Sequence, residues 1–380
     1  MPAPPVTRRT LAGMLGAAAG VSFLESTFGR PAAAAIASRG GEGDAIRLSA
    51  NENPYGPCAR GLEALGRSGR DAARYPDSLN RQTQEAIARL HGLAPDRIAL
   101  GCGSSDVLRM ADAAFLGPGK TLVAAEPTFE AVLEYARVTR AEAIKVPLTS
   151  DFRHDLARMA AACDPRTGLV YVCNPNNPTG TIVSGAELES FLRRVPSSTV
   201  VLLDEAYHHF VEDPAYRSGF DLLERFPNLV IARTFSKIYG MAGMRLGYGA
   251  ASAANAEALR AQASWDNTNE AVLAMALASL ADADVVPRQR KLLNDTRRWL
   301  CARLEKERRR YIPSETNFVM IDVGGDVAPV IRAFGERRIH VGRKFPSMPN
   351  WLRISIGKPE EMASFAAALS EIVPARAAAA

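Results

Sequence analysis

Short apolar runs alternate with amphipathic stretches from about residue 80 onward, and this alternation limits the folds that the chain can adopt. The six apolar runs before residue 240 are RIAL, KTLVAAEP, AIKVPL, GLVYVC, TVVLLDEAY and NLVIARTFS. Amphipathic segments such as 128–139 and 185–194 separate them. Strands that are apolar on both faces and separated by helices predict an α/β fold whose mainly parallel sheet is covered on both sides by helices. The ligands of such a sheet bind at the carboxyl ends of its strands.

The pattern changes near residue 269, where two long helical segments, 269–281 and 284–309, are followed by NFVMIDV, HVGRKF and WLRISIG. We therefore predict a large domain over 67–268 and a smaller α+β domain over 269–375. The preceding LSANENPYGP is too rich in Asn, Pro and Gly for a helix or strand. We expect residues 36–66 to form an arm that joins the small domain.

Residues 1–35 are predicted to be an export signal. Arg8 and Arg9 precede a run of small apolar residues that starts at Leu11 and ends in the alanine-rich PAAAAIA. The order resembles a twin-arginine signal, which predicts an exported or periplasmic protein. The alternative is a basic arm leading into an ordinary helix, in which case the protein is cytoplasmic. The apolar run is short for a bilayer span, so we expect no stable membrane anchor.

Charge and cysteine content exclude two classes of function. The formal net charge of +5 is spread along the chain without a basic stripe, which argues against a nucleic-acid partner. The five cysteines show neither CxxC nor zinc-ligand spacing, so no metal site and no disulfide framework are predicted.

Two segments place reactive groups at strand ends. RTFSKIYGMAGMRLGYG has Lys237 just after an apolar run and Arg245 eight residues later. A buried lysine without a partner is costly, so Lys237 is either exposed or chemically employed. VVLLDEAY puts Asp204 and Tyr207 at the end of another run. Asp204 could bind a metal, cap a helix, or face the ring nitrogen of a pyridoxal 5′-phosphate (PLP) cofactor, which it would keep protonated.

Two further segments offer polar groups in turns. YVCNPNNPTG presents the Asn177 amide in a turn fixed by two Asn-Pro steps. In RIALGCGSSDVLRM a predicted strand runs into Gly103, Ser104 and Ser105 before an amphipathic helix. The free N–H groups of a helix N-terminus suit a phosphate, although simple capping is the alternative.

Taken together and in order, these motifs resemble a known family. SANENPYGP, RYPD, GCGSSD, PTFE, NPNNPTG, DEAY, TFSK, GMRLGYG, NFV and WLRISIG look like the class I/II aminotransferases of PLP fold type I, especially the histidinol-phosphate aminotransferase-like group. The resemblance covers about residues 45 to 370. It implies PLP as cofactor and three catalytic residues. Lys237 would be the Schiff-base lysine, Asp204 would face the pyridine nitrogen, and Tyr207 would contact the phenolic oxygen.

The remaining roles are also carried over from the resemblance. Asn177 would assist Tyr207, and Phe129 would stack on the ring. The phosphate would be held by Gly103, Ser104, Ser105, Ser236 and Arg245. Tyr75 would reach the phosphate of the neighbouring subunit, which implies a homodimer. Substrate contacts would come from Arg353, paired with the carboxylate and helped by Asn317, and from Arg343.

The sequence departs from the family at the substrate positions. A Val-Arg-Asp step that helps to read a phosphorylated substrate appears here as HVGRKFP, with Arg343 displaced by one position. The loop ASWDNTNE, with Trp265 and Asp266, differs from the usual Pro-aromatic-Asn pattern, and Asp266 would favour a cationic substrate if it lined the pocket.

We predict an aminotransferase that moves an amino group between an L-amino acid and a 2-oxo acid. The alternatives are a PLP-dependent oxidase, cyclase or decarboxylase, a histidinol-phosphate aminotransferase proper, and a non-catalytic PLP-binding module.

Overall fold

A computed structural model of the chain describes residues 45–374. The predicted export signal, residues 1–35, lies outside the described residues. The described residues from Ile46 to 374 belong to one compact unit. Among the described residues, the structure has no helix whose length and apolar character would allow it to cross a membrane.

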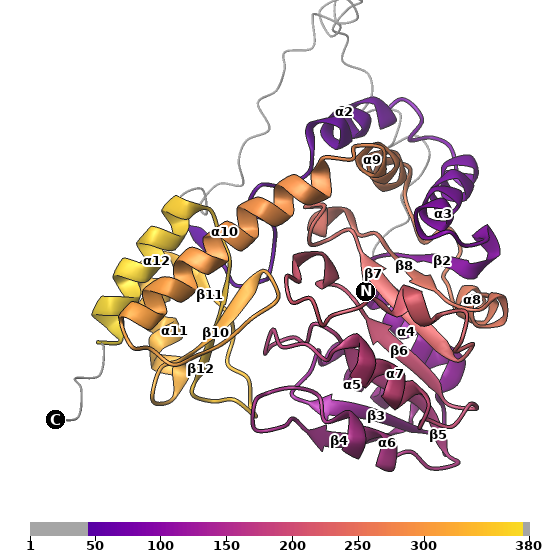
Figure 1. The fold of residues 1–380 in the computed structure, drawn as a ribbon. Coiled ribbons are helices and arrows are strands. Elements are labelled where there is room, and N and C mark those ends of the chain that lie inside the picture. Colours follow the sequence, from indigo (N-terminus) through magenta and orange to yellow (C-terminus); the bar gives the residue numbers. More distant parts are fainter. Residues whose placement is uncertain (1–44, 375–380) are drawn as a thin grey trace, which may run out of the picture. The chain divides into compact units, whose positions relative to one another are not determined.

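A seven-stranded sheet with the strand order β2-β8-β7-β6-β5-β3-β4 forms the centre of the larger part (Figure 1). Its strands are β2 (Ile98–Gly101), β3 (Thr121–Glu126), β4 (Glu142–Pro147), β5 (Thr167–Cys173), β6 (Val200–Asp204), β7 (Leu229–Thr234) and β8 (Gly247–Ala250). The neighbours from β4 to β7 pair in parallel, and β8 is antiparallel to both β2 and β7. The predicted α/β fold with a mainly parallel sheet is confirmed. Within this sheet, β8 is the strand that was not foreseen, because its four residues GYGA contain no apolar run.

Helices cover both faces of this sheet because successive strand residues point to opposite sides. Leu202 and Val230 face one hydrophobic cluster, to which α4, α5 and α8 contribute. Leu203 and Ile231 face the other cluster, with α6 and α7. These helices are α4 (Ser104–Phe115), α5 (Ala131–Thr139), α6 (Leu156–Ala161), α7 (Gly185–Leu192) and α8 (Ala253–Arg260).

The C-terminal part contains two small sheets. One has the antiparallel order β12-β10-β9, formed by β9 (Tyr311–Ile312), β10 (Phe318–Asp322) and β12 (Trp351–Ser355). The other pairs β1 (Ile46–Leu48) with β11 (Ile339–Val341) in parallel, so the start of the arm lies beside the C-terminal segment. The helices of this part are α10 (Val285–Lys306), α11 (Val327–Glu336) and α12 (Pro359–Ile372).

Three further helices are joined through contacts of α9. They are α2 (Ala59–Ser68), α3 (Asp77–His91) and α9 (Glu270–Leu280). Helix α9 packs on both α2 and α3, beside the large sheet in Figure 1. The domain boundaries predicted at 66 and 269 remain predictions, because the residues from Ile46 onward form one unit.

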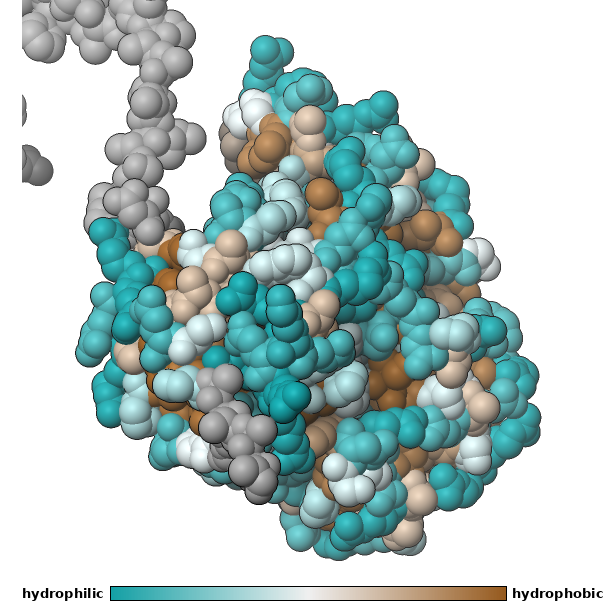
Figure 2. All heavy atoms as spheres, turned by 60° about the vertical axis from the view of Figure 1, so that its left-hand side comes forward, coloured by the Kyte–Doolittle hydropathy of each residue, from teal (hydrophilic) through white to brown (hydrophobic). Residues whose placement is uncertain are grey.

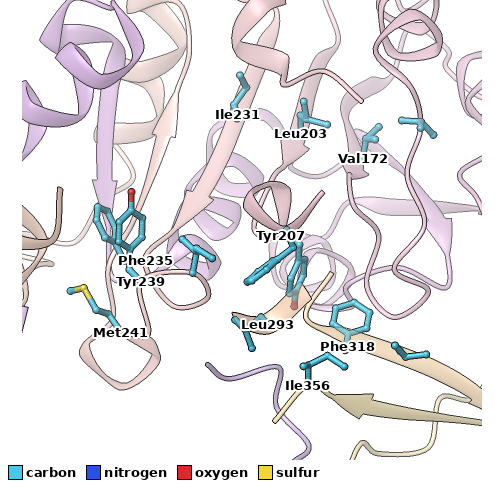
Figure 3. Close-up of a cluster of buried hydrophobic side chains, with 14 of the residues drawn as sticks. Val172, Leu203, Tyr207, Ile231, Phe235, Tyr239, Met241, Leu293, Phe318 and Ile356 are labelled. Atoms are coloured by element: carbon cyan, nitrogen blue, oxygen red, sulfur yellow. The ribbon is translucent and has the colours of Figure 1, made fainter. Parts of the chain in front are cut away.

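One hydrophobic cluster runs from the large sheet into the C-terminal part (Figure 3). Val172, Leu203 and Ile231 belong to β5, β6 and β7, and Phe318 belongs to β10. Tyr207 lies between them, with its ring 5.1 Å from that of Phe318 in an edge contact. The face shown in Figure 2 is mostly hydrophilic, as expected when the apolar residues are inside. The continuous core holds the end of the large sheet against the C-terminal strands.

Candidate active site

A cavity of about 340 Å³ lies where the carboxyl ends of β5, β6 and β7 meet the arm and the C-terminal part. Eleven of the residues predicted for the site line it. They are Ser104, Ser105, Phe129, Asn177, Asp204, Tyr207, Ser236, Lys237, Arg245, Arg343 and Arg353. The position agrees with the expectation for a parallel sheet, whose ligands bind beyond the carboxyl ends of the strands.

Lys237 carries a partly buried amine that faces the arm. Its Nζ donates to the backbone oxygen of Asn51 at 3.0 Å and to that of Ala50 at 3.3 Å. Burial, together with the positive charge of Arg353, lowers the pKa of Lys237 to about 8. A much larger fraction of this amine is therefore neutral near pH 7 than for an exposed lysine, as nucleophilic and proton-transfer chemistry requires.

Asp204 is a buried carboxyl at the last residue of β6. Its Oδ2 accepts a hydrogen bond from the Tyr171 hydroxyl at 2.8 Å, and its Oδ1 accepts one from the Ala206 N–H at 3.0 Å. Burial raises the pKa of Asp204 to about 6, and the bond from Tyr171 opposes that rise. No ion pair with a cationic side chain is formed by Asp204 among residues 45–374, so a protonated ring nitrogen in the cavity would supply its missing partner.

The Tyr207 hydroxyl is the meeting point of two amides. It accepts from Asn51 Nδ2 at 3.1 Å and from Asn177 Nδ2 at 3.4 Å. Burial raises the pKa of Tyr207 above its usual value, which keeps the phenol protonated and able to donate. Asn51, with a φ of 54°, was not predicted as a site residue. Only its place in an irregular, Asn-rich segment could have indicated it.

The start of α4 and Arg245 form a cradle on another wall. Gly103, the residue before α4, has a φ of 84° and no side-chain cap. A Cβ at this position would lie 2.3 Å from Arg245 Nη2, so only glycine allows the guanidinium to approach. Arg245 Nη1 also donates to Ser236 Oγ at 3.5 Å. Uncapped N–H groups beside a fixed guanidinium suit a phosphate.

Arg353 projects from β12 into the cavity and is held by the protein without an acidic partner. Its Nη1 donates to Asn177 Oδ1 at 2.8 Å and its Nη2 donates to the Ser49 carbonyl at 2.9 Å. Its buried Nε has no hydrogen-bond partner among the described residues. A guanidinium with spare donors and no acidic partner suits a carboxylate.

The rim of the cavity holds a second arginine and a carboxylate. Arg343 Nη2 donates to Glu130 Oε2 at 2.5 Å, and the Arg343 guanidinium lies over the Phe345 ring. Glu130 and Phe345 were not predicted as site residues. Asp266 is exposed and does not line the cavity of its own chain, because its neighbour Asn267 holds the loop to Asp106 and to the Leu100 carbonyl. The carboxylate at the rim is therefore Glu130 and not Asp266.

Three predicted residues lie outside the lining. Gly103 does not line the cavity, but its lack of a side chain leaves room for the Arg245 guanidinium, as described above. Asn317 is buried and donates to the backbone oxygens of Asn51 and Glu52, at 3.0 and 3.3 Å, so its amide supports the arm. Its predicted contact with the substrate stays a prediction. Tyr75 is 78% exposed and away from the cavity of its own chain. Its predicted role in a neighbouring subunit stays a prediction.

The lining fits PLP group by group. The cradle suits its phosphate, Asp204 its ring nitrogen, Tyr207 and Asn177 its phenolic oxygen, and Lys237 its aldehyde. Residues 45–374 contain no cluster of three or more His, Cys, Asp or Glu that could hold a metal ion. This fold with this site defines an α/β enzyme of PLP fold type I.

Comparisons with known proteins lead to the same class. The family model "Aminotransferase class I and II" matches residues 43–369. A histidinol-phosphate aminotransferase of Moorella thermoacetica is 38% identical over 333 residues, which cover 87% of this chain and 86% of that protein. One from Symbiobacterium thermophilum is 39% identical, with 86% and 90% covered. The crystal structure of histidinol-phosphate aminotransferase from Sinorhizobium meliloti in complex with pyridoxal-5′-phosphate has a TM-score of 0.81 and 29% identity, with 87% and 90% covered.

The chain belongs to the aminotransferase class I and II family. It is a PLP-dependent aminotransferase.

Proposed function

We propose that this aminotransferase takes the amino group of an L-amino acid whose α-carboxylate is bound by Arg353, and passes it to a 2-oxo acid bound in the same way. The observation that carries this proposal is the Arg353 guanidinium, which lines the cavity, keeps an unused hydrogen on each terminal nitrogen and has no acidic partner among the described residues. Both reactants of a transamination have a carboxylate next to the reacting carbon. One anchor therefore serves both half-reactions.

Lys237 supplies the covalent attachment and the proton transfer in this proposal. PLP, when bound, supplies an electron-withdrawing ring that takes up the charge left when the substrate loses its α-proton. The Nζ of Lys237 would take the proton from the α-carbon of the substrate and then return it as a general acid. Asp204 would hold the ring nitrogen protonated, and the Tyr207 hydroxyl with the Asn177 amide would orient the phenolic oxygen. Arg353 and Asn177 are bonded at 2.8 Å, which couples the substrate anchor to the cofactor anchor.

The test is chemical trapping followed by turnover. Borohydride reduction of the purified protein should fix PLP on Lys237, and digestion with mass spectrometry should locate it. Lys237→Ala should lose turnover by several orders of magnitude because the attachment and the base disappear together. Recovery of PLP on a different lysine would refute the assignment. A 2-oxo acid that forms without any amino acceptor would favour an oxidase or another PLP outcome.

A second candidate substrate is histidinol phosphate, which the names of the relatives indicate. The rim of this cavity supports it less well, since Arg343 is already paired with Glu130 and a phosphate would approach that carboxylate. We expect little activity on histidinol phosphate compared with an amino acid that has a free α-carboxylate. Efficient turnover of histidinol phosphate would reverse this order.

We also propose a homodimer in which Tyr75 contacts the phosphate in the neighbouring subunit. The 78% exposure of this aromatic side chain supports the proposal, as does the family resemblance, which implies a homodimer. Sedimentation should give twice the chain mass. Mixing inactive Tyr75→Ala and Lys237→Ala chains should restore part of the activity, because one of the two mixed sites has both residues intact. No recovery in confirmed mixed dimers would contradict the shared site.

Export through the twin-arginine route is proposed from the order of residues 1–35. PLP binds to a folded protein, so loading precedes transport and demands a route that accepts folded cargo. Replacing Arg8 and Arg9 with Lys should leave active holoenzyme in the cytoplasm. Unchanged export of that variant, measured by cell fractionation, would remove the targeting proposal and leave the enzymatic one intact.

A further inference from the structure

Tyr171 is a buried phenol to which the site described above gives no role of its own. It stands on β5 and is fully buried in the hydrophobic cluster to which α4, α5 and α8 contribute. Its hydroxyl donates to Asp204 Oδ2 at 2.8 Å. A phenylalanine would bury the same ring without carrying a polar atom into that cluster. The hydroxyl is therefore best explained by its partner, the carboxyl predicted to face the ring nitrogen of PLP.

The pairing of β5 with β6 brings this hydroxyl to the carboxyl. In the parallel register Cys173 lies opposite Asp204, and Tyr171 lies opposite Leu202. Residues two apart along a strand point to the same face of a sheet, so Tyr171, Cys173 and Asp204 share one face. The long tyrosine side chain reaches Asp204 along the diagonal. On the other side of β6, Asp204 pairs with Ala232, whose methyl group offers no donor.

The hydrogen bonds to Asp204 leave room for the cofactor. Within residues 45–374, the Ala206 N–H donates to Oδ1 at 3.0 Å and the Tyr171 hydroxyl donates to Oδ2 at 2.8 Å. Each carboxylate oxygen can accept two bonds, so both keep a position for a donor in the cavity that Asp204 lines. Tyr171 does not line that cavity, so it acts on a bound group only through Asp204.

The Tyr171 phenol keeps its proton near neutral pH and can donate it only as a hydrogen bond. Burial, together with the charge of Asp204, raises the pKa of Tyr171 well above its usual value. The Cys173 thiol beside it is also protonated, because burial raises its pKa, and its Sγ donates to the Pro175 carbonyl at 3.2 Å. The Tyr171 hydroxyl therefore remains a donor to Asp204.

Burial has the largest influence on the pKa of Asp204, which it raises, and two charged side chains act on it as well. Glu205 raises this pKa by repulsion, although its own carboxylate is paired with the Arg233 guanidinium at 2.6 Å. Lys237 lowers it by attraction, but its amine is bonded to the arm and is the group predicted to join PLP. Tyr171 is the side chain that contacts the carboxyl directly.

Burial also sets up a competition for the proton between Asp204 and the ring nitrogen. A carboxyl group and a neutral pyridine cost less to bury than a carboxylate and a pyridinium, because two charges lose more solvation. The bond from Tyr171 favours the charged arrangement, because a hydrogen bond to a carboxylate is about twice as strong as one to a neutral group. This difference shifts the position of the proton about tenfold toward the nitrogen.

We propose that Tyr171 is a positioning residue that keeps the proton on the ring nitrogen of PLP, by donating its hydroxyl hydrogen to Asp204 from outside the cavity. The inference rests on the proposed function, in which Asp204 faces that nitrogen. It deepens that function, because a protonated ring withdraws electrons from the substrate more strongly.

The first measurement follows Asp204 in the full chain without PLP. With carbon-13 in the aspartate carboxyl groups, the Asp204 signal is the one that Asp204→Asn lacks, and its NMR titration gives the pKa that burial raises to about 6. In Tyr171→Phe this pKa should rise further, by about one unit, which is a tenfold change. Site-specific 3-fluorotyrosine at position 171 should lower it, because the more acidic phenol is a stronger donor. A packing defect would not produce both changes.

The second measurement uses holoenzyme that carries nitrogen-15 in the PLP ring. The ring-nitrogen NMR signal should lie at the protonated position in the wild type and move toward the unprotonated position in Tyr171→Phe. An Asp204 pKa that is equal or lower in Tyr171→Phe, or a ring-nitrogen signal that does not move, would overturn the inference.

Tyr248→Phe is the matched control. Tyr248 is buried on β8, its hydroxyl is hydrogen-bonded to His91 Nε2 at 2.8 Å, and it does not line the cavity. This variant also loses a buried hydroxyl, so the Asp204 pKa and the ring-nitrogen signal should both stay at their wild-type values. Changes of the same size in both variants would overturn the inference while the proposed function stands. Failure of every α-amino acid to react with PLP-loaded wild-type protein would overturn the proposed function itself.

Discussion

Replacing Arg353 with lysine tests how the substrate carboxylate is bound. In the structure one hydrogen of Nη1 is used by Asn177 and one of Nη2 by the Ser49 carbonyl. One hydrogen on each terminal nitrogen remains for a carboxylate, so the substrate can form two parallel charge-assisted bonds.

A lysine at position 353 has three donors for the same partners. If two of them replace the bonds to Asn177 and Ser49, one remains for the substrate. The variant then loses one charge-assisted hydrogen bond, worth about 1.5–3 kcal/mol. This loss corresponds to a decrease in kcat/KM of roughly 10- to 150-fold.

The assay measures kcat/KM for several amino acids and, in parallel, the PLP content from the visible absorption band. PLP should stay bound, because Arg353 does not line the phosphate cradle. Arg310→Lys is the control, since this exposed arginine directly precedes β9 of the same small sheet, with its guanidinium 5.2 Å from the Trp351 ring centroid. A change below about threefold for every carboxylate substrate, or loss of PLP, would refute the reasoning.

Two further predictions concern the perturbed pKa values of Asp204 and Lys237. Asp204→Asn should lower turnover by orders of magnitude, yet stabilise the cofactor-free protein at pH 7 by about 1–2 kcal/mol in denaturant unfolding. The pKa of the Asp204 carboxyl is raised from its ordinary value of 3.8 to about 6, so ionising it in the folded state costs roughly 3 kcal/mol. The asparagine avoids this cost but loses one hydrogen bond, worth about 1 kcal/mol. A less stable variant would contradict this prediction. The rate of covalent PLP loading should rise with pH and level off near pH 8, because only the neutral Lys237 amine reacts and its pKa is lowered to about 8. Stopped-flow absorbance measures this rate, and a rise that continues unchanged to pH 10 would show an unperturbed lysine.

Most of the cofactor site could be predicted from the sequence because its groups stand at strand ends. Asp204 is the last residue of β6, Lys237 follows β7 by three residues, and Asn177 lies in the loop after β5. The ends of parallel strands meet at one edge of a sheet, so the order of apolar runs already brings these three together.

The substrate side of the site could not be predicted in the same way. Glu130 and Arg343 are 213 residues apart, and their contact depends on how the C-terminal part packs against the loop before α5. Asn317 lies next to β10 and appeared suited to a substrate contact, but its amide is turned toward the arm. The direction of a side chain at a strand end depends on packing partners that are distant in sequence.

The sequence by itself determined the class of fold, because hydrophobic periodicity is a local feature. The resemblance of its short polar motifs to the aminotransferase family implied the cofactor, and the roles of the individual residues toward that cofactor stay predictions. Only the tertiary structure decided which charges face the substrate. Gly342 leaves room for the backbone of Arg353, the guanidinium groups of Arg343 and Arg353 both lie near the Phe345 ring, and Arg343 pairs with Glu130 at the rim. These contacts join segments that are far apart along the chain, and their geometry follows from the packing of the whole core, which no local pattern specifies.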